Sequence, residues 1–383
     1  MKRRREEEAN NYNNNNDEEI IIIKIGGSSI TNKAVEETLN QDAINWFASL
    51  ISGCVHTSFL HHTSASSSSS SDGDNIEEEE KTTSSDTQQE GSSSSSRKKK
   101  KPKIVVIHGA GSFGHHSAKR YGLQCGKQAV LSGGASPHPD SSSNLQMSKR
   151  YQMEALSKTR HSVQKLNAAM VQTLLDYGVN AVGISPGVSI PGMRAYGSSS
   201  SSSSSSGGAA AMDLLCESIR QSLDAGLLPV IHGDACLLDD NDAGILGGDT
   251  LVEGLVGSSN NTKMKEHVRN VIFITDVAGV FSSDPKRNSN ARLIRSLKVD
   301  MMTGEVAIDD NNSEEVGKME IGGSSHAHDV TGGLKAKLGA AVTAVQCGKD
   351  VIIVQCCSTS AEKFVQGHDP STVEEGTVIT RKL

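Results

Sequence analysis

The chain has few aromatic residues and no strong excess of charge of either sign. Phe, Trp and Tyr make up 3% of its 383 residues, and the formal net charge at pH 7 is −7. Proteins that bind nucleic acid usually present a basic surface, often with aromatic side chains on which bases stack. The composition therefore argues against a nucleic-acid partner.

Long apolar segments and paired cysteine motifs are also missing. No apolar run reaches about 18 residues, so we expect no transmembrane helix and no membrane partner. The first residues lack the apolar core of a signal peptide, and their acidic character argues against a transit peptide. Seven cysteines are scattered without a Cys-x-x-Cys pair, as is typical of reduced thiols. We therefore expect a cytoplasmic protein with no dedicated metal site.

Several segments have compositions that cannot build a core. Residues 1–19 are charged and Asn-rich, which predicts a disordered tail. Low-complexity stretches at about 57–101, 133–148 and 196–210 are rich in Ser or Gly and are predicted to be surface loops. Apart from these inserts, residues 20–383 are predicted to form a single domain.

Short apolar runs alternate with helical patterns along the rest of the chain. The predicted strands are 20–25, 103–108, 179–184, 228–232, 271–275 and 351–355. The predicted helices are about 40–53, 113–121, 146–177, 211–225, 247–256 and 333–347. Continuously apolar strands are typical of a sheet buried on both faces, and the alternation predicts an α/β fold with a mainly parallel sheet. Ligands of such sheets bind beyond the carboxyl ends of the strands.

The most informative segment is IVVIHGAGSFGHH at residues 104–116, where an apolar run stops at a glycine-rich loop. Such loops bring backbone N–H groups against anions, usually phosphates. The glycines also match the dinucleotide fingerprint G-x-G-x-x-G. That interpretation needs an acidic residue at the end of the next strand, whereas the next acidic residue here is Asp140 in a Ser/Pro/Gly stretch. A tight turn without a ligand is the other alternative.

Three further segments repeat this pattern. IIIIKIGGSSITNK at 20–33 places a lysine directly before a Gly-Gly-Ser turn, and it is no Walker A loop. VIFITDVAGVFSSDPK at 271–286 ends a strand in Thr-Asp, and DVTGGLKAKLGAAVTAV at 329–345 opens a helix with glycines and lysines. Any one of them could be an ordinary loop, but four in one chain predict a phosphate-binding site.

The ordered motifs resemble those of the amino acid kinase superfamily. They are K-x-G-G-S-x-I-T-x-K, H-G-A-G-S-F-G-H, L-P-V-I-H-G-D, G-G-D-T, T-D-V-x-G-V-F-x-x-D-P-K and D-V-T-G-G-L-x-x-K. They run from Lys24 to Lys337, and the G-S-F-G-H ending at His115 is similar to the isopentenyl phosphate kinase branch. The resemblance implies an open αβα sandwich, usually dimeric, that phosphorylates isopentenyl phosphate with ATP. Magnesium would travel with the ATP, held mainly by phosphate oxygens and water.

The resemblance also implies roles for individual residues. The implied catalytic residues are Lys24, Lys33, His115, Asp249 and Lys337. The implied nucleotide-binding residues are Lys24, Gly26, Gly27, Ser28, Gly111, Asp276, Gly279, Lys286, Gly333 and Lys337. The implied acceptor-binding residues are Ala110, His115 and Gly248. In this interpretation Asp249 orients the lysines, the imidazole of His115 meets the acceptor phosphate, and His116 has no assigned role.

Two other functions stay open at this stage. The chain could be a sibling kinase that acts on another phosphate, phosphonate or acyl acceptor. It could also be a nucleotide-binding module that kept the fold without turnover, although the joint presence of Lys24, His115, Asp249 and Lys337 argues against this. For a hydrocarbon acceptor, the helical segments 146–177 and 113–121 are the predicted walls of the apolar pocket.

Overall fold

The structure is a computed structural model that describes most of the chain outside the low-complexity stretches. The described residues are 18–56, 101–121, 123, 143–193, 206–237, 243–257, 262–283, 285, 288–309, 318–319, 332–370 and 374–382. Nearly all of the predicted tail and of the first insert lies outside them, as does Lys286. The division into one domain with inserts stays a prediction.

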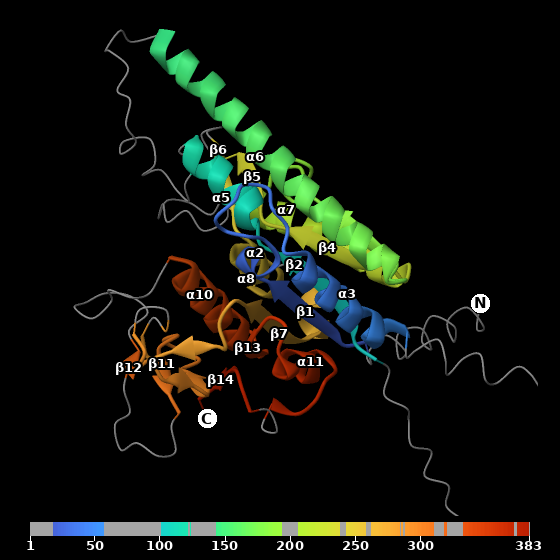
Figure 1. Ribbon diagram of the computed structural model, residues 1–383, viewed down its shortest axis with the longest axis vertical. Coiled ribbons are helices and arrows are strands. Elements are labelled where there is room, and N and C mark those ends of the chain that lie inside the picture. Colours follow the sequence, from blue (N-terminus) through green and yellow to red (C-terminus); the bar gives the residue numbers. More distant parts are fainter. Residues whose placement is uncertain are drawn as a thin grey trace, which may run out of the picture.

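A ten-stranded, mainly parallel sheet forms the centre of the molecule (Figure 1). Its parallel part contains, in spatial order, β13 (Asp350–Gln355), β7 (Val268–Thr275), β1 (Ile20–Ile25), β2 (Lys103–His108), β4 (Leu228–His232) and β3 (Ala181–Ile184). Beyond β13, the sheet continues through β14 (Thr377–Arg381), β10 (Ser296–Val299), β11 (Val306–Ile308) and β12 (Lys318–Met319). This part is mixed, because only the β10–β14 pair is parallel.

Two small hairpins stand outside the main sheet. β5 (Asp234–Leu237) pairs with β6 (Ala243–Leu246), and β8 (Val280–Phe281) pairs with β9 (Leu293–Ile294), both antiparallel. The short strands from β8 to β12, like β14, lack the long apolar runs that marked the predicted strands, and sequence analysis missed them.

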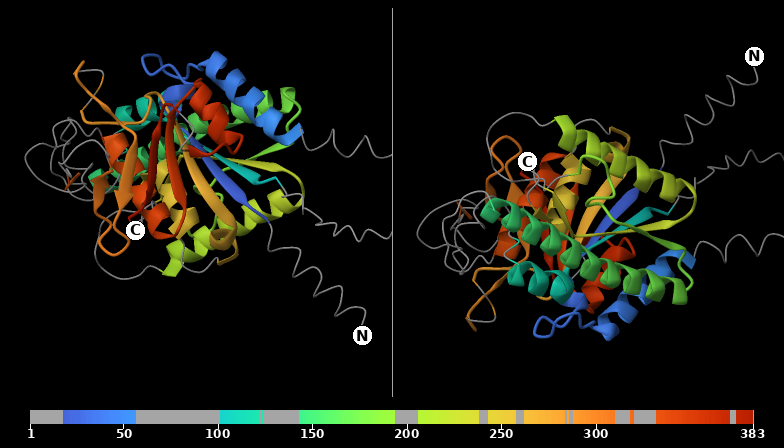
Figure 2. Two further views of the ribbon diagram at one scale, coloured as in Figure 1. Left: turned by 90° about the horizontal axis from the view of Figure 1, so that it is seen from below. Right: turned by 90° about the horizontal axis from the view of Figure 1, so that it is seen from above.

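Helices cover both faces of the sheet (Figure 2). One face is covered by α3 (Gln41–His56), α6 (Ser143–Asp176) and α11 (Thr359–Val365). The other is covered by α7 (Ser206–Asp224), α8 (Gly248–Gly257), α9 (Thr262–His267) and α10 (Gly332–Gln346). Two further helices, α2 (Gly27–Ile30) and α5 (Gly111–Arg120), begin directly after the glycine loops that follow β1 and β2. The predicted αβα sandwich is confirmed.

Alternation along β1 explains why its first four residues are all apolar. Ile20 and Ile22 pack into the cluster beneath α7, α8 and α10, whereas Ile21 and Ile23 pack into the cluster beneath α3 and α6. Successive side chains of a strand point to opposite faces, so a sheet covered on both sides buries every residue. Each fully buried isoleucine contributes roughly 1.5–3 kcal/mol to folding.

Two helices begin earlier than predicted. α6 begins at Ser143 and α7 at Ser206, so the ends of the predicted loops 133–148 and 196–210 are helical. The reason is composition: the start of α6 contains Leu, Gln, Met and Lys, and the start of α7 contains three alanines, all strong helix formers. The predicted helix ends are confirmed at Gly178, which has φ +80° and terminates α6 in the left-handed conformation.

The parallel order brings the glycine loops together at one edge of the sheet. Backbone hydrogen bonds continue past the strand ends, from Gly26 N to Ile274 O (2.8 Å), from Gly109 N to Ile25 O (3.0 Å) and from Gly233 N to His108 O (2.9 Å). These bonds hold the loops after β1, β2 and β4 side by side, at the edge where the sequence predicted them.

Candidate active site

The loops after β1 and β2 touch through their backbones. A Cβ atom added to Gly27 would lie 2.1 Å from Gly111 N and 2.9 Å from the carbonyl carbon of Gly109. No side chain fits at such distances, so this contact alone requires glycine at position 27. Gly111 adds a second constraint, because its φ is +52°. The glycines therefore bring the two loops into direct contact.

Thr31 connects these two loops through its hydroxyl group. Its Oγ1 donates to Gly27 O at 2.7 Å and accepts a hydrogen bond from Ser112 N at 2.9 Å, and the side chain is buried. Because this buried hydroxyl both donates and accepts a hydrogen bond, it needs no water as a partner. Thr31 belongs to the motif K-x-G-G-S-x-I-T-x-K but received no role from the sequence. A threonine in a turn carries no sequence signal that distinguishes it from other turn residues.

Lys24 and Asp249 form an ion pair at the centre of this edge. Lys24 has the same parity along β1 as Ile20 and Ile22, so its side chain lies on the face covered by α8. There its Nζ is 2.6 Å from Oδ1 of Asp249, in the first turn of α8. A Cβ at Gly248 would lie 3.3 Å from Lys24 Cε, so α8 begins against the lysine stem. The pair is nearly buried, with side-chain exposures of 7% and 14%.

Lys33 and Asp276 form a second ion pair, which is largely exposed. Their Nζ and Oδ2 atoms are 3.1 Å apart, although the residues are 243 positions apart in the sequence. His116 Nε2 contacts Lys33 O at 2.9 Å and so ties this loop to α5. His116, which received no role from the sequence, has this structural contact. The pair unites the loops after β1 and β7.

Lys337 lies close to both ion pairs. Burial, followed by the ammonium group of Lys24, lowers the pKa of Lys337 to about 8. The carboxylates of Asp249 and Asp276 oppose this shift, and Lys33 adds to it. Three lysines and two carboxylates thus interact electrostatically around the first turns of α10. Gly333, at the start of α10, is exposed and has open space around it.

His115 stands on the first turns of α5 and is exposed. Its Nδ1 is 2.8 Å from the backbone oxygen of Gly111, and a carbonyl can only accept a hydrogen bond. Nδ1 therefore carries the proton and donates to Gly111. In the neutral ring Nε2 is then an acceptor, and it becomes a donor only when the imidazole is protonated. His115 can donate to an anion only in its charged form.

The remaining predicted residues have simpler surroundings. Ser28 lies half-buried in α2, and Ala110 is the residue that precedes the first turn of α5. Gly279 is buried against Thr377, whose Oγ1 would lie 2.5 Å from an added Cβ. Its contacts are therefore those of a packing residue between β8 and β14.

A polar network that sequence analysis did not identify surrounds the loop after β3, next to the candidate site. Asp234, which ends the motif L-P-V-I-H-G-D, has a fully buried side chain that pairs with Arg160 of α6 and accepts from Gly187 N at 2.9 Å. Ser185 Oγ links Arg160 to His232 Nε2 at 2.9 Å. The network holds the loop after β3 against Gly233, whose own backbone approaches Gly248.

His232 stacks on His108, with ring centroids 5.8 Å apart. Burial, together with His232, lowers the pKa of His108 to about 3, and burial also lowers the pKa of His232. Both rings are therefore neutral near pH 7. Their burial makes these two histidines part of the packed interior.

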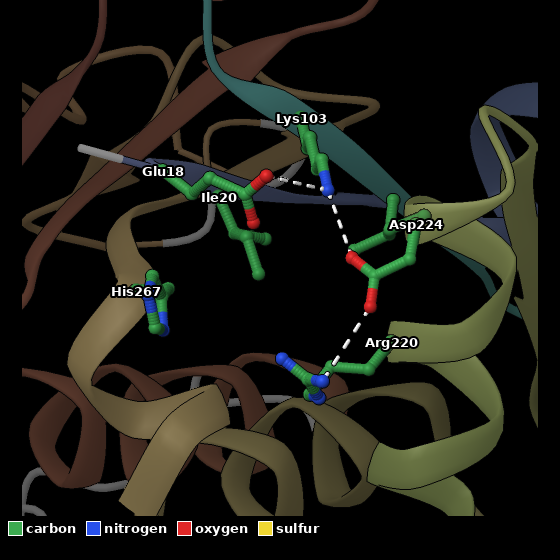
Figure 3. Close-up of a pocket in the computed structure, with 7 residues that line it drawn as sticks. Glu18, Ile20, Lys103, Arg220, Asp224 and His267 are labelled. Carbon is green, nitrogen blue, oxygen red and sulfur yellow. Dashed lines mark hydrogen bonds and ion pairs between the residues drawn. The ribbon is translucent and has the colours of Figure 1, made fainter. Parts of the chain in front are cut away.

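A separate cavity lies at the opposite edge of the sheet (Figure 3). In it, Lys103 Nζ lies 2.9 Å from Glu18 Oε1 and 3.0 Å from Asp224 Oδ1. The volume of about 10 Å³ is roughly the room of one water molecule. Its lysine and arginine, Lys103 and Arg220, are already paired with carboxylates, and the cavity lies at the starts of β1 and β2, so it is no part of the candidate site.

Metal-binding clusters and membrane-spanning helices are both absent from the described part of the chain. No group of three or more His, Cys, Asp and Glu side chains in it is arranged to hold a metal ion. Likewise, none of the helices described here combines the length and the apolar character needed to cross a bilayer.

Comparison with known proteins identifies the family. Residues 92–355 match the amino acid kinase family, and an isopentenyl phosphate kinase of Arabidopsis thaliana is 30% identical over 285 residues, which is 72% of each chain. The chain belongs to the amino acid kinase family. A second member, the isopentenyl phosphate kinase of Thermoplasma acidophilum, is 26% identical over 54% of this chain and 65% of its own length.

A solved structure of an isopentenyl phosphate kinase has the same fold as this chain. It has a TM-score of 0.57 and 21% identity, and the match covers 94% of this chain and all of that chain. The amino acid kinase fold expected from the motifs is confirmed.

Proposed function

We propose that this kinase transfers the terminal phosphoryl group of ATP to isopentenyl phosphate, forming isopentenyl diphosphate. Phosphoryl transfer requires donor and acceptor to be held next to each other and the developing charge to be neutralised. The observation that carries the proposal is the contact between the Gly27 and Gly111 backbones, which sets a lysine-bearing loop directly beside the loop of His115. The relatives named isopentenyl phosphate kinase support the choice of acceptor.

On the donor side, Lys24 and Lys337 would neutralise the phosphates as charge moves toward the leaving ADP. Asp249 would keep the Lys24 ammonium in place, because the 2.6 Å ion pair fixes a side chain that has several rotatable bonds. The free N–H groups at the starts of α2, α8 and α10 add positive electrostatic potential. Lys33 and Asp276 would lie at the outer side of the nucleotide.

On the acceptor side, His115 would bind the monophosphate through protonated Nε2, while Ala110 and Gly248 contribute backbone close to it. An apolar cluster lies beside α5 and supports a hydrocarbon-bearing acceptor. It comprises Ala118, Leu123, Ala155, Leu156, Ala235 and Ala243, with Tyr121, Met153, Leu237 and Ile245 packed against it. The cluster lies between α5, α6 and the β5–β6 hairpin, and it supports α5 and α6 as the proposed walls for the hydrocarbon part of the acceptor.

The proposal includes Mg²⁺, a homodimer and a cytoplasmic location. Three lysines alone would counter much of the charge of a triphosphate, and Mg²⁺ would enter with ATP, bound mainly by phosphate oxygens and water. Phosphate oxygens and water would hold the ion, and Asp249 and Asp276 are carboxylates of the candidate site that would bind its water molecules.

An ADP-release assay with a panel of acceptors tests the proposal. Isopentenyl phosphate should support turnover, whereas carbamate, acetylglutamate, UMP and a simple phosphonate should not. Turnover with another acceptor alone would identify a sibling kinase instead. ATP binding without turnover on any acceptor would point to a nucleotide-binding module.

A further inference from the structure

Two adjacent cysteines lie at the same edge of the sheet as the candidate active site. Cys356 and Cys357 form the turn between β13 and α11, and their sulfur atoms are 3.7 Å apart. Cys357 is exposed and Cys356 is half-buried. Cys357 has φ +61°, a left-handed conformation that is uncommon for a residue with a side chain. The turn therefore presents two thiols together at the protein surface.

Hydrogen bonds on both sides hold this turn in place. Cys356 N donates to Thr275 O at 2.8 Å, which fixes the turn to the end of β7. On the other side, Ser358 Oγ donates to Gln355 O at 2.7 Å and accepts from Ala361 N at 3.1 Å, so the cap of α11 closes the turn. The two thiols are preorganised, and a ligand that bridges them has little conformational entropy to overcome.

The sulfur separation indicates which chemistry the pair favours. A direct disulfide needs sulfurs about 2.05 Å apart and Cα atoms usually 4.4–6.8 Å apart, whereas adjacent residues hold Cα atoms about 3.8 Å apart. A direct disulfide would therefore be strained. Two sulfurs bound to one tetrahedral centre at about 2.3 Å each lie about 3.8 Å apart. The observed 3.7 Å is close to this separation, and the exposed Cys357 side chain needs to move only a few tenths of an ångström to reach the shorter separation of a pyramidal, trivalent centre.

The number of protein ligands available limits which kind of atom can bridge the two sulfurs. A structural zinc ion takes four protein ligands and a catalytic one takes three. In the part of the chain that the structure describes, no set of three or more His, Cys, Asp and Glu side chains is positioned for a metal. A trivalent organic arsenical, whose third position is already filled by carbon, needs only two thiols. We propose that Cys356 and Cys357 form a chelating dithiol site for trivalent organic arsenicals.

The binding step balances without any oxidant. The hydrated arsenical carries two As–OH groups. Each thiol forms one As–S bond, each As–O bond breaks, and each thiol proton leaves with a hydroxyl group as water. Arsenic stays trivalent throughout. Burial and the neighbouring Cys357 raise the pKa of the Cys356 thiol, so the exposed Cys357 reacts first and Cys356 closes the ring.

Phenylarsine oxide is the probe for this site. Native protein should take up one phenylarsenic group and lose two titratable thiols, and the group should be removed by 2,3-dimercaptopropanol but not by an equal concentration of 2-mercaptoethanol. Cys356→Ser and Cys357→Ser should each weaken uptake by about 10²-fold or more, since the chelate is lost. Cys347→Ser, which changes a single half-buried thiol elsewhere, should have no effect.

Peptide mapping keeps the test decisive even if a variant folds poorly. Cleavage after lysine gives a peptide, residues 350–363, that contains Cys356 and Cys357 and no other cysteine. The arsenic should be found on this peptide in the native adduct. Arsenic on any other peptide, or equal uptake by Cys357→Ser, would overturn the proposal. The test needs no turnover, so its outcome is independent of the proposed kinase reaction.

Discussion

The ammonium group of Lys24 lies 2.6 Å from the carboxylate of Asp249, joining the last part of β1 to the first turn of α8. Both side chains are almost shielded from solvent, so the pair is strong enough to fix geometry and costly to break from one side. An aspartate alone beside a triphosphate would repel it. In the proposed mechanism Asp249, paired with Lys24 and close to Lys337, orients positive charge instead.

Lys24→Met should lower kcat by about 10²-fold or more, because it removes a preorganised charge that matters most in the transition state. Methionine keeps most of the apolar stem, so the protein should remain folded, with a melting temperature lowered by the unpaired carboxylate of Asp249. Steady-state kinetics with isopentenyl phosphate, together with a thermal melt, measure both effects. Lys103→Met, at the opposite edge of the sheet, is the matched control and should leave kcat unchanged. Near-normal turnover of a folded Lys24→Met variant would remove Lys24 from the mechanism.

ATP affinity should fall as the pH rises above about 8, the pKa of Lys337 in the free protein. Phosphate oxygens favour the ammonium form of Lys337, so bound ATP raises its pKa. At any pH between the pKa of the free protein and the higher pKa of the complex, ATP binding takes up a proton. The dissociation constant should rise by up to about tenfold per pH unit there. Calorimetry in two buffers of different ionisation enthalpy detects the proton.

Lys337→Arg provides the control for this pH effect, since a guanidinium group stays charged and should abolish the proton uptake. An equal proton uptake in Lys337→Arg would assign the effect to another group.

Without ligand, the protonation of Lys337 affects the stability of the fold. The unfolded chain binds the Lys337 proton up to its ordinary pKa of 10.5, so between about 8 and 10.5 this residue makes the folded state more stable as pH rises.

The central strands could be predicted because their burial leaves a direct mark on the sequence. β1, β2 and β4 have the predicted bounds, since a strand covered on both faces is apolar along most of its length. The strands from β8 to β12 contain two to four residues each, too few for any hydrophobic period to emerge. Their positions depend on the neighbouring strands rather than on their own residues.

The site could be predicted in its parts but not in its contacts. Glycine loops and lysines are visible as motifs, whereas the partner of each is chosen by the fold: Lys33 meets Asp276 across 243 positions. Likewise, the glycines were attributed to phosphate binding, while Gly27 is already required by its contact with Gly111. Arg160 and Asp234 were missed because a buried ion pair has no periodic signal in a single sequence.

Gly27→Ala should damage both stability and activity. The new methyl group would lie 2.1 Å from Gly111 N, so the two loops must move apart, and that movement separates donor from acceptor. We expect a lower melting temperature and a loss of kcat/KM of at least about tenfold, since small displacements at a reacting centre are costly. Gly339→Ala is the control: its Cβ meets nothing within 4 Å in the middle of α10, and it should stabilise by up to about 1 kcal/mol. Unchanged kinetics in Gly27→Ala would show that the loop contact is not needed for transfer.

His115 should determine the use of the acceptor rather than of ATP. Because Nδ1 donates to Gly111 O, only the protonated ring offers Nε2–H to a phosphate. His115→Ala should therefore lower kcat/KM for isopentenyl phosphate by about 10-fold to 10²-fold, the value of a hydrogen bond to a charged group, while KM for ATP changes little. His115→Gln should retain more activity than alanine, since its amide is a neutral donor. The neighbouring His116→Gln is the matched control, because its ring contacts Lys33 O and should not select the acceptor. If His115→Ala weakened ATP and acceptor equally, the imidazole would be holding the α5 turn in shape, and the assignment of acceptor recognition to His115 would be wrong.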